Sequence, residues 1–261
     1  MGGLYDSSYT RAHLVFRARS ARETPWLQRL LLLREHGAPD AERLQKNDLT
    51  PRPPLVGENE CRLAAPPSVL RWLVQHATKP NGWQSSGSDV DRDRERLFRR
   101  DPEMIRFALD LLANGELRRG WQVLEGPTAR DVSIETPDAI VVIEGKRTEA
   151  DPTTSTNSML GWHQMWRRID AAWESRENRR VAGFLIVESK AGEDIPAHLQ
   201  AAANATWGNV AMEQSLPHRS PQEREQLRNC FLGASTWQRV VREFKLPSNV
   251  LRHERVNKAG S

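Results

Sequence analysis

Among the charged side chains of a short segment of the chain, residues 131–146 (DVSIETPDAIVVIEGK), two carboxylates and one ammonium group could act together. The carboxylates belong to Asp131 and Glu144, and the ammonium group belongs to Lys146. Carboxylate oxygens are the ligands that Mg²⁺ and Mn²⁺ prefer in proteins. A bound ion of this kind assists phosphodiester hydrolysis, because it lowers the pKa of the attacking water and neutralises developing negative charge. A neighbouring lysine can orient that water or hold the phosphate as a point charge.

These three side chains meet only if the segment folds as a β-hairpin. Pro137 fixes φ near −65°, which favours a turn centred on Pro137 and Asp138. A turn at this point places Asp131 directly opposite Glu144, with their Cβ atoms about 5 Å apart. Side chains alternate along a strand, so Lys146 is expected on the same face as Glu144.

The same register gives the hairpin an apolar face. It places Val132 opposite Ile143 and Ile134 opposite Val141, on the side of the sheet away from the carboxylates. Directly facing carboxylates destabilise a sheet, which favours a cation between them. The alternative is an ordinary hairpin with a surface cluster of charges, which contributes little to stability.

This arrangement resembles the PD-(D/E)xK superfamily of restriction-endonuclease-like phosphodiesterases. In that superfamily, an acid on the second strand and an acid-x-Lys tripeptide on the third strand bind the metal. Asp131 matches the first acid, and Glu144 and Lys146 match the tripeptide. The resemblance implies Mg²⁺ or Mn²⁺ as cofactor, held by Asp131, Glu144 and the main-chain carbonyl of Gly145.

The sequence departs from the family pattern at the first acid. The residue before Asp131 is Arg130, where the family has proline. The literal pair Pro137-Asp138 lies in the predicted turn, too close to the tripeptide to serve as the first acid. The resemblance extends loosely to the helix-β-β-β-helix-β order of residues 101–190. It does not explain the N-terminal part or the C-terminal third of the chain.

Two further acids are auxiliary candidates. Related nucleases often place a glutamate on the helix before the first strand, and Glu103 occupies that place. An acid in the first turn of a helix also simply complements the helix dipole, and this explanation is favoured for Glu103. Glu125 ends the first predicted strand, where it either approaches the metal or lies on the rim of the site.

The helix after the third strand supplies the candidate substrate-binding residues. Some subfamilies carry a Gln-x-x-x-Tyr motif on this helix, and here Gln164 is followed four positions later by Arg168. With His163, these residues could contact phosphates. The favoured alternative is a solvated helix face on the side away from an apolar seam. The seam, which we expect in the core, consists of Met159, Trp162, Trp166, Ile169 and Trp173.

The surrounding elements predict an α/β fold: a central mixed β-sheet of about four strands flanked by helices, restriction-endonuclease-like, with helical N- and C-terminal additions. The predicted strands are residues 121–125, 131–135, 139–144 and 181–187. The predicted helices are residues 25–33, 67–77, 102–113 and 158–174, with another starting at a capping box at Ser220.

We expect one nuclease-like domain at residues 59–250, preceded by a helical extension and linker at residues 1–58 and followed by a basic tail at residues 251–261. The two cysteines lie far apart, which predicts neither a disulfide framework nor a zinc site. Phosphate-binding glycine loops and serine-hydrolase signatures are missing from the sequence. There is no signal-peptide pattern and no apolar run of membrane-spanning length.

These features together predict a metal-dependent nuclease. The net charge of +4 and the pI of about 9.4 are compatible with a polyanionic partner. We expect that partner to be nucleic acid, DNA in preference to RNA, and we expect a cytoplasmic protein without a membrane partner. The alternative is a catalytically inactive nuclease-like fold that serves as a nucleic-acid-binding or protein-interaction module.

Overall fold

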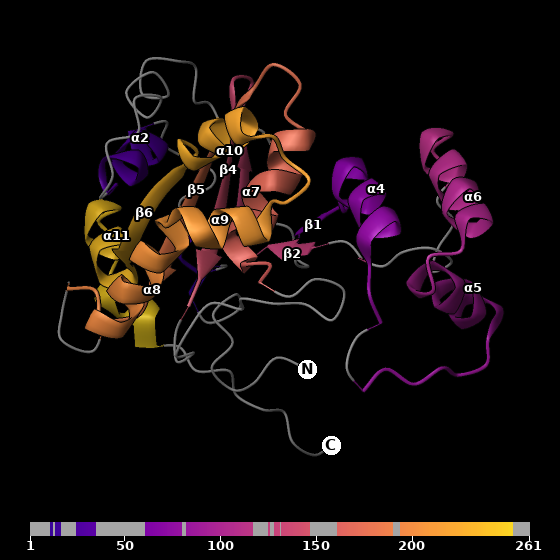
Figure 1. Ribbon diagram of the computed structural model, residues 1–261. Coiled ribbons are helices and arrows are strands. Elements are labelled where there is room, and N and C mark those ends of the chain that lie inside the picture. The colour runs from indigo at the N-terminus through magenta and orange to yellow at the C-terminus, as the bar shows by residue number, and fades with distance from the viewer. Residues whose placement is uncertain are drawn as a thin grey trace, which may run out of the picture.

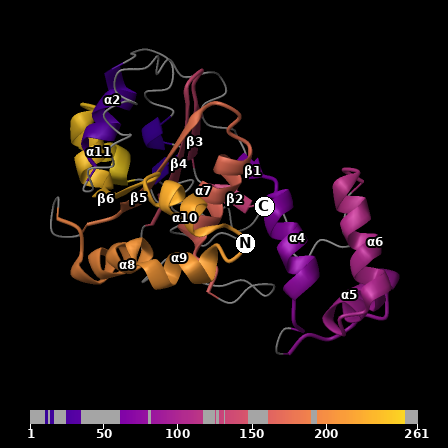
Figure 2. The same cartoon turned by 45° about the horizontal axis from the view of Figure 1, so that its top comes forward.

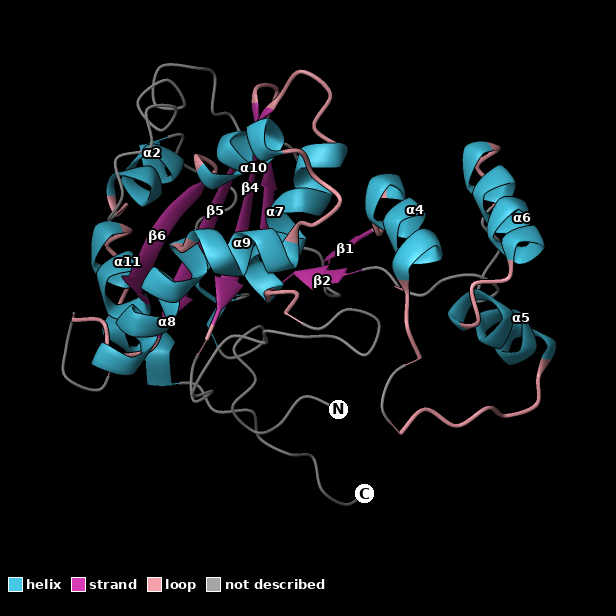
Figure 3. Cartoon of the chain, viewed as in Figure 1, coloured by secondary structure: helices cyan, strands magenta, loops and turns pink. Residues whose placement is uncertain are grey.

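The computed structural model, drawn in Figures 1 and 3, describes residues 11–12, 14–16, 25–34, 61–79, 82–116, 125, 128–130, 132–146, 161–189 and 194–252. Several sequence predictions lie outside the described residues. These are the position of Asp131, residues 121–124 of the first predicted strand, Met159 in the apolar seam, the linker at residues 47–58 and the tail after residue 252.

A four-stranded mixed sheet forms the centre of the fold, in the order β3-β4-β5-β6. β3 and β4 are the antiparallel hairpin, and β5 and β6 both run parallel to β4. The predicted α/β class, with a mixed sheet flanked by helices, is therefore confirmed. The strands are β3 (Val132–Glu135), β4 (Ala139–Gly145), β5 (Arg180–Val187) and β6 (Phe231–Thr236).

The predicted register of the hairpin is confirmed along β3 and β4. Val132 pairs with Ile143, and Ile134 pairs with Val141. The turn is closed by Thr136, whose backbone N–H donates to the carbonyl of Ala139 at 2.8 Å. Asp131 immediately precedes β3 and lies outside the described residues, so its pairing with Glu144 stays a prediction.

Helices cover both faces of the sheet, as Figures 1 and 2 show. This explains why β4 and β5 read as almost continuous apolar runs, since their side chains are buried on both sides. One face carries α2 (Pro25–Leu32) and α11 (Trp237–Glu243). The other carries α7 (Gln164–Glu174), α8 (Ala197–Trp207), α9 (Asn209–Ser215) and α10 (Pro221–Arg228).

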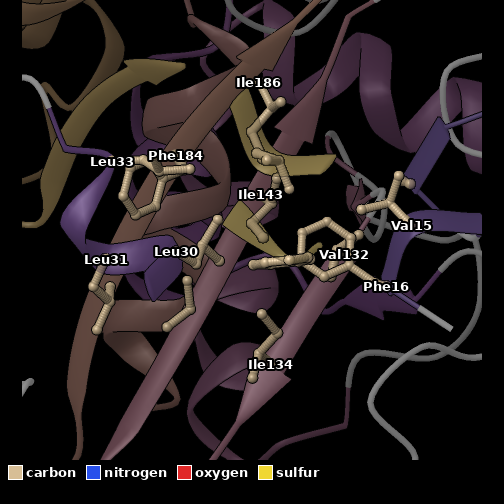
Figure 4. Close-up of a cluster of buried hydrophobic side chains, with 14 of the residues drawn as sticks. Val15, Phe16, Leu30, Leu31, Leu33, Val132, Ile134, Ile143, Phe184 and Ile186 are labelled. Carbon is tan, nitrogen blue, oxygen red and sulfur yellow. The ribbon is translucent and has the colours of Figure 1, made fainter. Parts of the chain in front are cut away.

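The described part of the N-terminal region belongs to the core of this sheet. Figure 4 shows side chains from residues 15–16 and from α2 and Leu33 against the apolar face of β3, β4 and β5. The buried apolar side chains from this region are Ala12, Val15, Phe16, Leu30, Leu31 and Leu33. Residues before the sheet thus supply part of one of its two cover layers, together with α11.

On the other face, Gly183 sets how closely α7 approaches the sheet. A Cβ at this position would lie 2.6 Å from Ile169 Cδ1 and 2.6 Å from Met165 Cε. Such distances are well inside van der Waals contact, so the side chains of Ile169 and Met165 would have to shift to accommodate a Cβ. The glycine in β5 therefore lets these two side chains of α7 pack directly on the strand.

The structure differs from the sequence predictions in several elements. The region after residue 187 is mostly helical, in line with the expected helical C-terminal addition, but it also contains β6, which pairs with β5 and was not predicted. Glu125, the expected end of the first strand, lies in a bend instead. A separate two-stranded sheet, β1 (Cys61–Leu63) with β2 (Thr128–Arg130), was not predicted. Finally, α7 begins at Gln164, later than expected, because His163 is its N-cap.

A group of three helices lies beside α7 in both views: α4 (Pro67–His76), α5 (Asp89–Phe98) and α6 (Pro102–Ala113). The helices predicted at residues 67–77 and 102–113 are confirmed. The arginines of α5 pair with nearby acids, for example Arg94 with Asp91, as expected for a salt-bridged helix face. A 3-10 helix, η2 (Ser248–Arg252), follows α11. Among the described residues, the helices are too short or too polar to span a bilayer.

Candidate functional site

Glu144 and Lys146 lie together at the carboxyl end of β4. The Nζ atom of Lys146 is 2.9 Å from Oε1 of Glu144, and both side chains are buried. Both point toward α7, because they continue the alternation of Ile140 and Val142, which pack beneath that helix. The sequence prediction that these two groups share one face is therefore confirmed.

α7 brings two more predicted residues to the same place. A guanidinium nitrogen of Arg168 forms an ion pair with Oε2 of Glu144, and the same nitrogen, Nη1, lies 3.5 Å from the carbonyl of Ile143. One turn earlier on the helix, Oε1 of Gln164 accepts a hydrogen bond from Lys146 Nζ at 3.2 Å. Residues four apart lie on one face of a helix, so Gln164 and Arg168 reach β4 together.

The favoured alternative of a solvated helix face is wrong for Arg168 and His163, which are only 3% and 6% exposed. The apolar seam itself is confirmed, since Trp162, Trp166 and Ile169 are buried. The flank beside the seam is buried as well, because α7 contacts both the main sheet and the small β1–β2 sheet. A single sequence offers no signal for this second contact, since β1 lies far away along the chain.

The main chain of Lys146 is held on both sides by distant parts of the chain. Its N–H donates to the carbonyl of Ile186 on β5 at 2.8 Å. Its carbonyl accepts a hydrogen bond from the indole Nε1 of Trp237 at 3.2 Å. Trp237 opens α11 and is fully buried. Sequence reasoning missed this positioning residue, because no local pattern connects it to the hairpin.

The two auxiliary acids have different surroundings. Glu125 is buried and forms an ion pair with Arg167, whose guanidinium lies 5.1 Å from the ring centroid of Trp162. Arg167 is adjacent to Arg168, so Glu125 is brought to the same end of α7. Glu103 lies exposed in the first turn of α6, which packs against α4 and α5 and is well separated from β4 in both views. The structure therefore does not bring Glu103 to the site.

His163 caps α7 and is held in one orientation. Its ring Nδ1 accepts a hydrogen bond from the main-chain N–H of Met165 at 3.1 Å. The main-chain N–H of His163 donates to Oγ of Ser215 at 3.0 Å. Burial, and to a lesser extent the charge of Lys146, lowers the pKa of His163 from 6.5 to about 4. Because Nδ1 accepts, the neutral imidazole carries its proton on Nε2.

This lowered pKa predicts a loss of stability in mild acid. Between pH 6.5 and about 4, the unfolded chain binds a proton at His163 that the folded chain does not, so the free energy of unfolding falls as the pH falls. Across this window, the free energy of unfolding falls by about 3 kcal/mol because of His163. Above pH 6.5, His163 causes no such loss. Urea unfolding of His163→Asn, which keeps a cap oxygen but cannot titrate, should show a correspondingly weaker dependence on pH.

The exposed His76 provides the matched control. His76→Gln should retain the pH dependence of the parent protein. An equal slope of stability against pH in His163→Asn and in the parent would contradict the prediction.

The oxygen donors at the site suit a hard divalent ion in type, but the described part supplies only one charged ligand. That ligand is Glu144. Ser133, on the same face of the sheet, has a buried hydroxyl with no hydrogen-bond partner among the described residues, and Gly145 offers a carbonyl oxygen. No group of three or more His, Cys, Asp and Glu side chains is placed to hold a metal within the described ranges. A second carboxylate would have to come from Asp131.

Comparisons with known proteins give no match to this chain. No protein-family model matches it, and neither does any curated protein or solved structure. The functional conclusion therefore depends on the residues, contacts and topology of the chain itself.

Proposed function

We propose that the protein is a Mg²⁺-dependent nuclease of the PD-(D/E)xK type, a phosphodiester hydrolase acting on nucleic acid. The observation that carries the proposal is the convergence of Glu144 and Lys146, at the end of β4, with Gln164 and Arg168 of α7. Three of these side chains are charged and buried. Burying charges costs several kcal/mol per ion and gives folding little in return, which favours a functional reason for the cluster.

The topology supports the same conclusion. After the β3–β4 hairpin, the chain crosses over through α7 and returns as β5, parallel to β4. This crossover lays the first turn of α7 beside the carboxyl end of β4. In open α/β sheets, ligands bind outside the carboxyl ends of the strands. The order β-β-helix-β from β3 to β5 agrees with the later part of the order that the family resemblance implies.

The side chains divide into a metal side and a substrate side. Asp131, Glu144 and the carbonyl of Gly145 would hold the ion. When bound, Mg²⁺ supplies an acidified water and neutralises charge on the phosphate. Lys146, whose ammonium group contacts Glu144 and Gln164, would orient the attacking water. Arg168 offers a planar guanidinium, the group best suited to a phosphate.

Metal dependence is the direct test. The full chain should cleave end-labelled DNA, and RNA less readily, with Mg²⁺ or Mn²⁺ in the buffer. EDTA should stop cleavage, because water attacks a phosphodiester only very slowly without an activating ion. Addition of excess Mg²⁺ should restore it. Cleavage that persists in EDTA, or none with either metal, would rule out the proposed reaction.

The second candidate function is a nuclease-like fold that binds nucleic acid or a protein without cutting. One observation favours it: both carboxylate oxygens of Glu144 are engaged by cations of the chain, Oε1 by Lys146 and Oε2 by Arg168. A calorimetric titration separates the two candidates. Nucleic-acid binding without any Mn²⁺ binding would support the second.

A further inference from the structure

One continuous stretch of the chain, residues 64–88, contains no Asp or Glu. Its described residues, 64–79 and 82–88, include α4 and the segment that precedes α5. Arg71 and Lys79 give it a positive charge, and both side chains are exposed. In a chain with 34 acidic residues, such a stretch favours a polyanionic partner at this part of the surface.

Two tryptophans and a histidine lie among these cations. The rings of Trp72 and His76 are stacked, with centroids 4.7 Å apart and planes 12° from parallel. The Nδ1 atom of His76 lies 2.9 Å from the carbonyl of Trp72, which fixes the orientation of the exposed imidazole. Trp72 is itself anchored, because it packs against the apolar cluster under α4. The pair is thus a rigid aromatic stack with its imidazole end open to solvent.

The second tryptophan, Trp83, also packs against another aromatic ring. Its ring packs edge-on against Phe98 of α5, with centroids 5.5 Å apart and an interplanar angle of 81°. The ammonium group of Lys79 lies 5.2 Å from the centroid of the same ring. Lys79 therefore lies over the face of the Trp83 ring, so a phosphate that approaches this ring would meet a cation.

Asp89 and Asp91, in the first turn of α5, do not cancel this charge, because arginines of the same helix already pair with them. Asp91 accepts hydrogen bonds from the N–H and hydroxyl of Ser86, and Asp89 forms an ion pair with Arg92. Hydrogen bonds from Ser86 hold the pKa of Asp91 below its usual value. The carboxylates in the first turn of α5 are therefore already paired with side chains of the chain itself.

The position of α4 relative to the candidate site is fixed through α7. Trp162, which precedes α7, is buried in the same apolar cluster as the inner face of α4. At the other end of α7, the carboxylate of Glu174 accepts hydrogen bonds from the N–H of Ser68 at 3.2 Å and from its hydroxyl at 3.0 Å. The helix that carries Gln164 and Arg168 is thus attached to α4 at both ends.

We propose that Arg71, Trp72, His76, Lys79 and Trp83, called here the α4 surface, bind single-stranded nucleic acid and deliver it to the site at Glu144. The inference rests on the proposed nuclease function and specifies its substrate class. Aromatic rings can stack only on bases that are not already stacked in a duplex, and interleaved cations bind the backbone phosphates. A lipid surface fits less well, because the aliphatic side chains Val69, Leu70, Leu73 and Val74 of α4 are all buried.

Binding in EDTA tests the α4 surface without cleavage. The probes are a fluorescein-labelled 20-mer of mixed sequence and the same 20-mer annealed to its complement, measured by anisotropy with the full chain. The single strand should bind at least about tenfold more tightly than the duplex, since stacking on aromatic rings needs free bases. His76→Ala, an exposed change, should weaken single-strand binding about fivefold or more.

Lys79→Gln should act through charge. Removing one phosphate contact to a single strand should reduce the slope of log affinity against log salt by about 0.7. The matched control is Lys245→Asn, which removes an exposed cation after α11 and tolerates the left-handed backbone there (φ 53°). Lys245→Asn should leave both affinity and slope unchanged. Thermal melting of each variant checks that it is folded.

The inference is overturned if the duplex binds as tightly as the single strand, or if His76→Ala and Lys79→Gln bind like the parent. It is also overturned if vesicles of phosphatidylserine and phosphatidylcholine bind better than the oligonucleotide. Failure of the proposed nuclease function is distinguishable. In that case, no metal-dependent cleavage occurs although single-strand binding in EDTA depends on His76 and Lys79.

Discussion

Glu144→Gln is expected to reduce Mg²⁺-dependent cleavage at least about 100-fold, measured as initial rate on an end-labelled oligonucleotide. Substitution of residues that merely support metal ligands costs 10- to 100-fold, so loss of a charged ligand should cost no less. The amide keeps the shape of the side chain and can still accept a hydrogen bond from Lys146 or Arg168. Because these two buried cations lose their counter-ion, the melting temperature of the variant is measured beside its activity, and cleavage is compared at a temperature where it is folded.

Glu135→Gln is the matched control for this change. Glu135 lies on the same hairpin at its turn end, where it pairs with Arg179 and is partly exposed. It should cleave like the parent protein. Asp131→Asn should reproduce the loss seen with Glu144→Gln if Asp131 is the second ligand. Parent-like cleavage by Glu144→Gln would remove the basis of the proposed function.

Arg168→Met is expected to lower the free energy of unfolding by about 3–5 kcal/mol, because it leaves the buried carboxylate of Glu144 with one cation in place of two. Urea denaturation at pH 7 measures the loss. A second change in the same chain, Glu144→Gln, should recover part of it, since the amide carries no charge to compensate. The double-mutant cycle thus measures the coupling between the two side chains.

The comparison for Arg168 is an ion pair at the surface. Arg92 and Asp89 pair on α5 with side chains that are 66% and 82% exposed. Arg92→Met should cost no more than about 1 kcal/mol, because water replaces the lost partner. If Arg168→Met and Arg92→Met lower the free energy of unfolding equally, the buried ion pair of Glu144 costs no more than a surface pair. The burial of these charges would then no longer favour a functional role for them.

The sequence was sufficient to predict the hairpin because its determinants are local. Pro137 and Asp138 set the turn, and alternation then determines which side chains share a face. That register alone predicts that Glu144 and Lys146 lie on the same face of the hairpin, without knowledge of any other element. The same holds for the two helices at residues 67–77 and 102–113. Both have a proline at the start and a local apolar spacing, and Asp101 caps the second.

The rest of the site is set by contacts between distant segments. β6 is short and contains Gly233, Ser235 and Thr236, so no apolar run marks it as a strand, yet its pairing with β5 buries every residue. The burial of Arg168 depends on what covers the flank of α7. Its spacing from Gln164 predicts a shared helix face, but only the packing of that face against β4 makes it part of the site.

The hydrogen bond from Trp237 to the carbonyl of Lys146 has a consequence for biosynthesis. A ribosome completes the β3–β4 hairpin long before it adds Trp237, which follows Lys146 by 91 residues. A nascent chain that ends before β6 has the side chains of Glu144 and Lys146 but not the sheet neighbour and indole that hold this part of the fold. The site therefore matures late in translation, and prematurely terminated products should be incompetent for the chemistry even when they contain the complete motif.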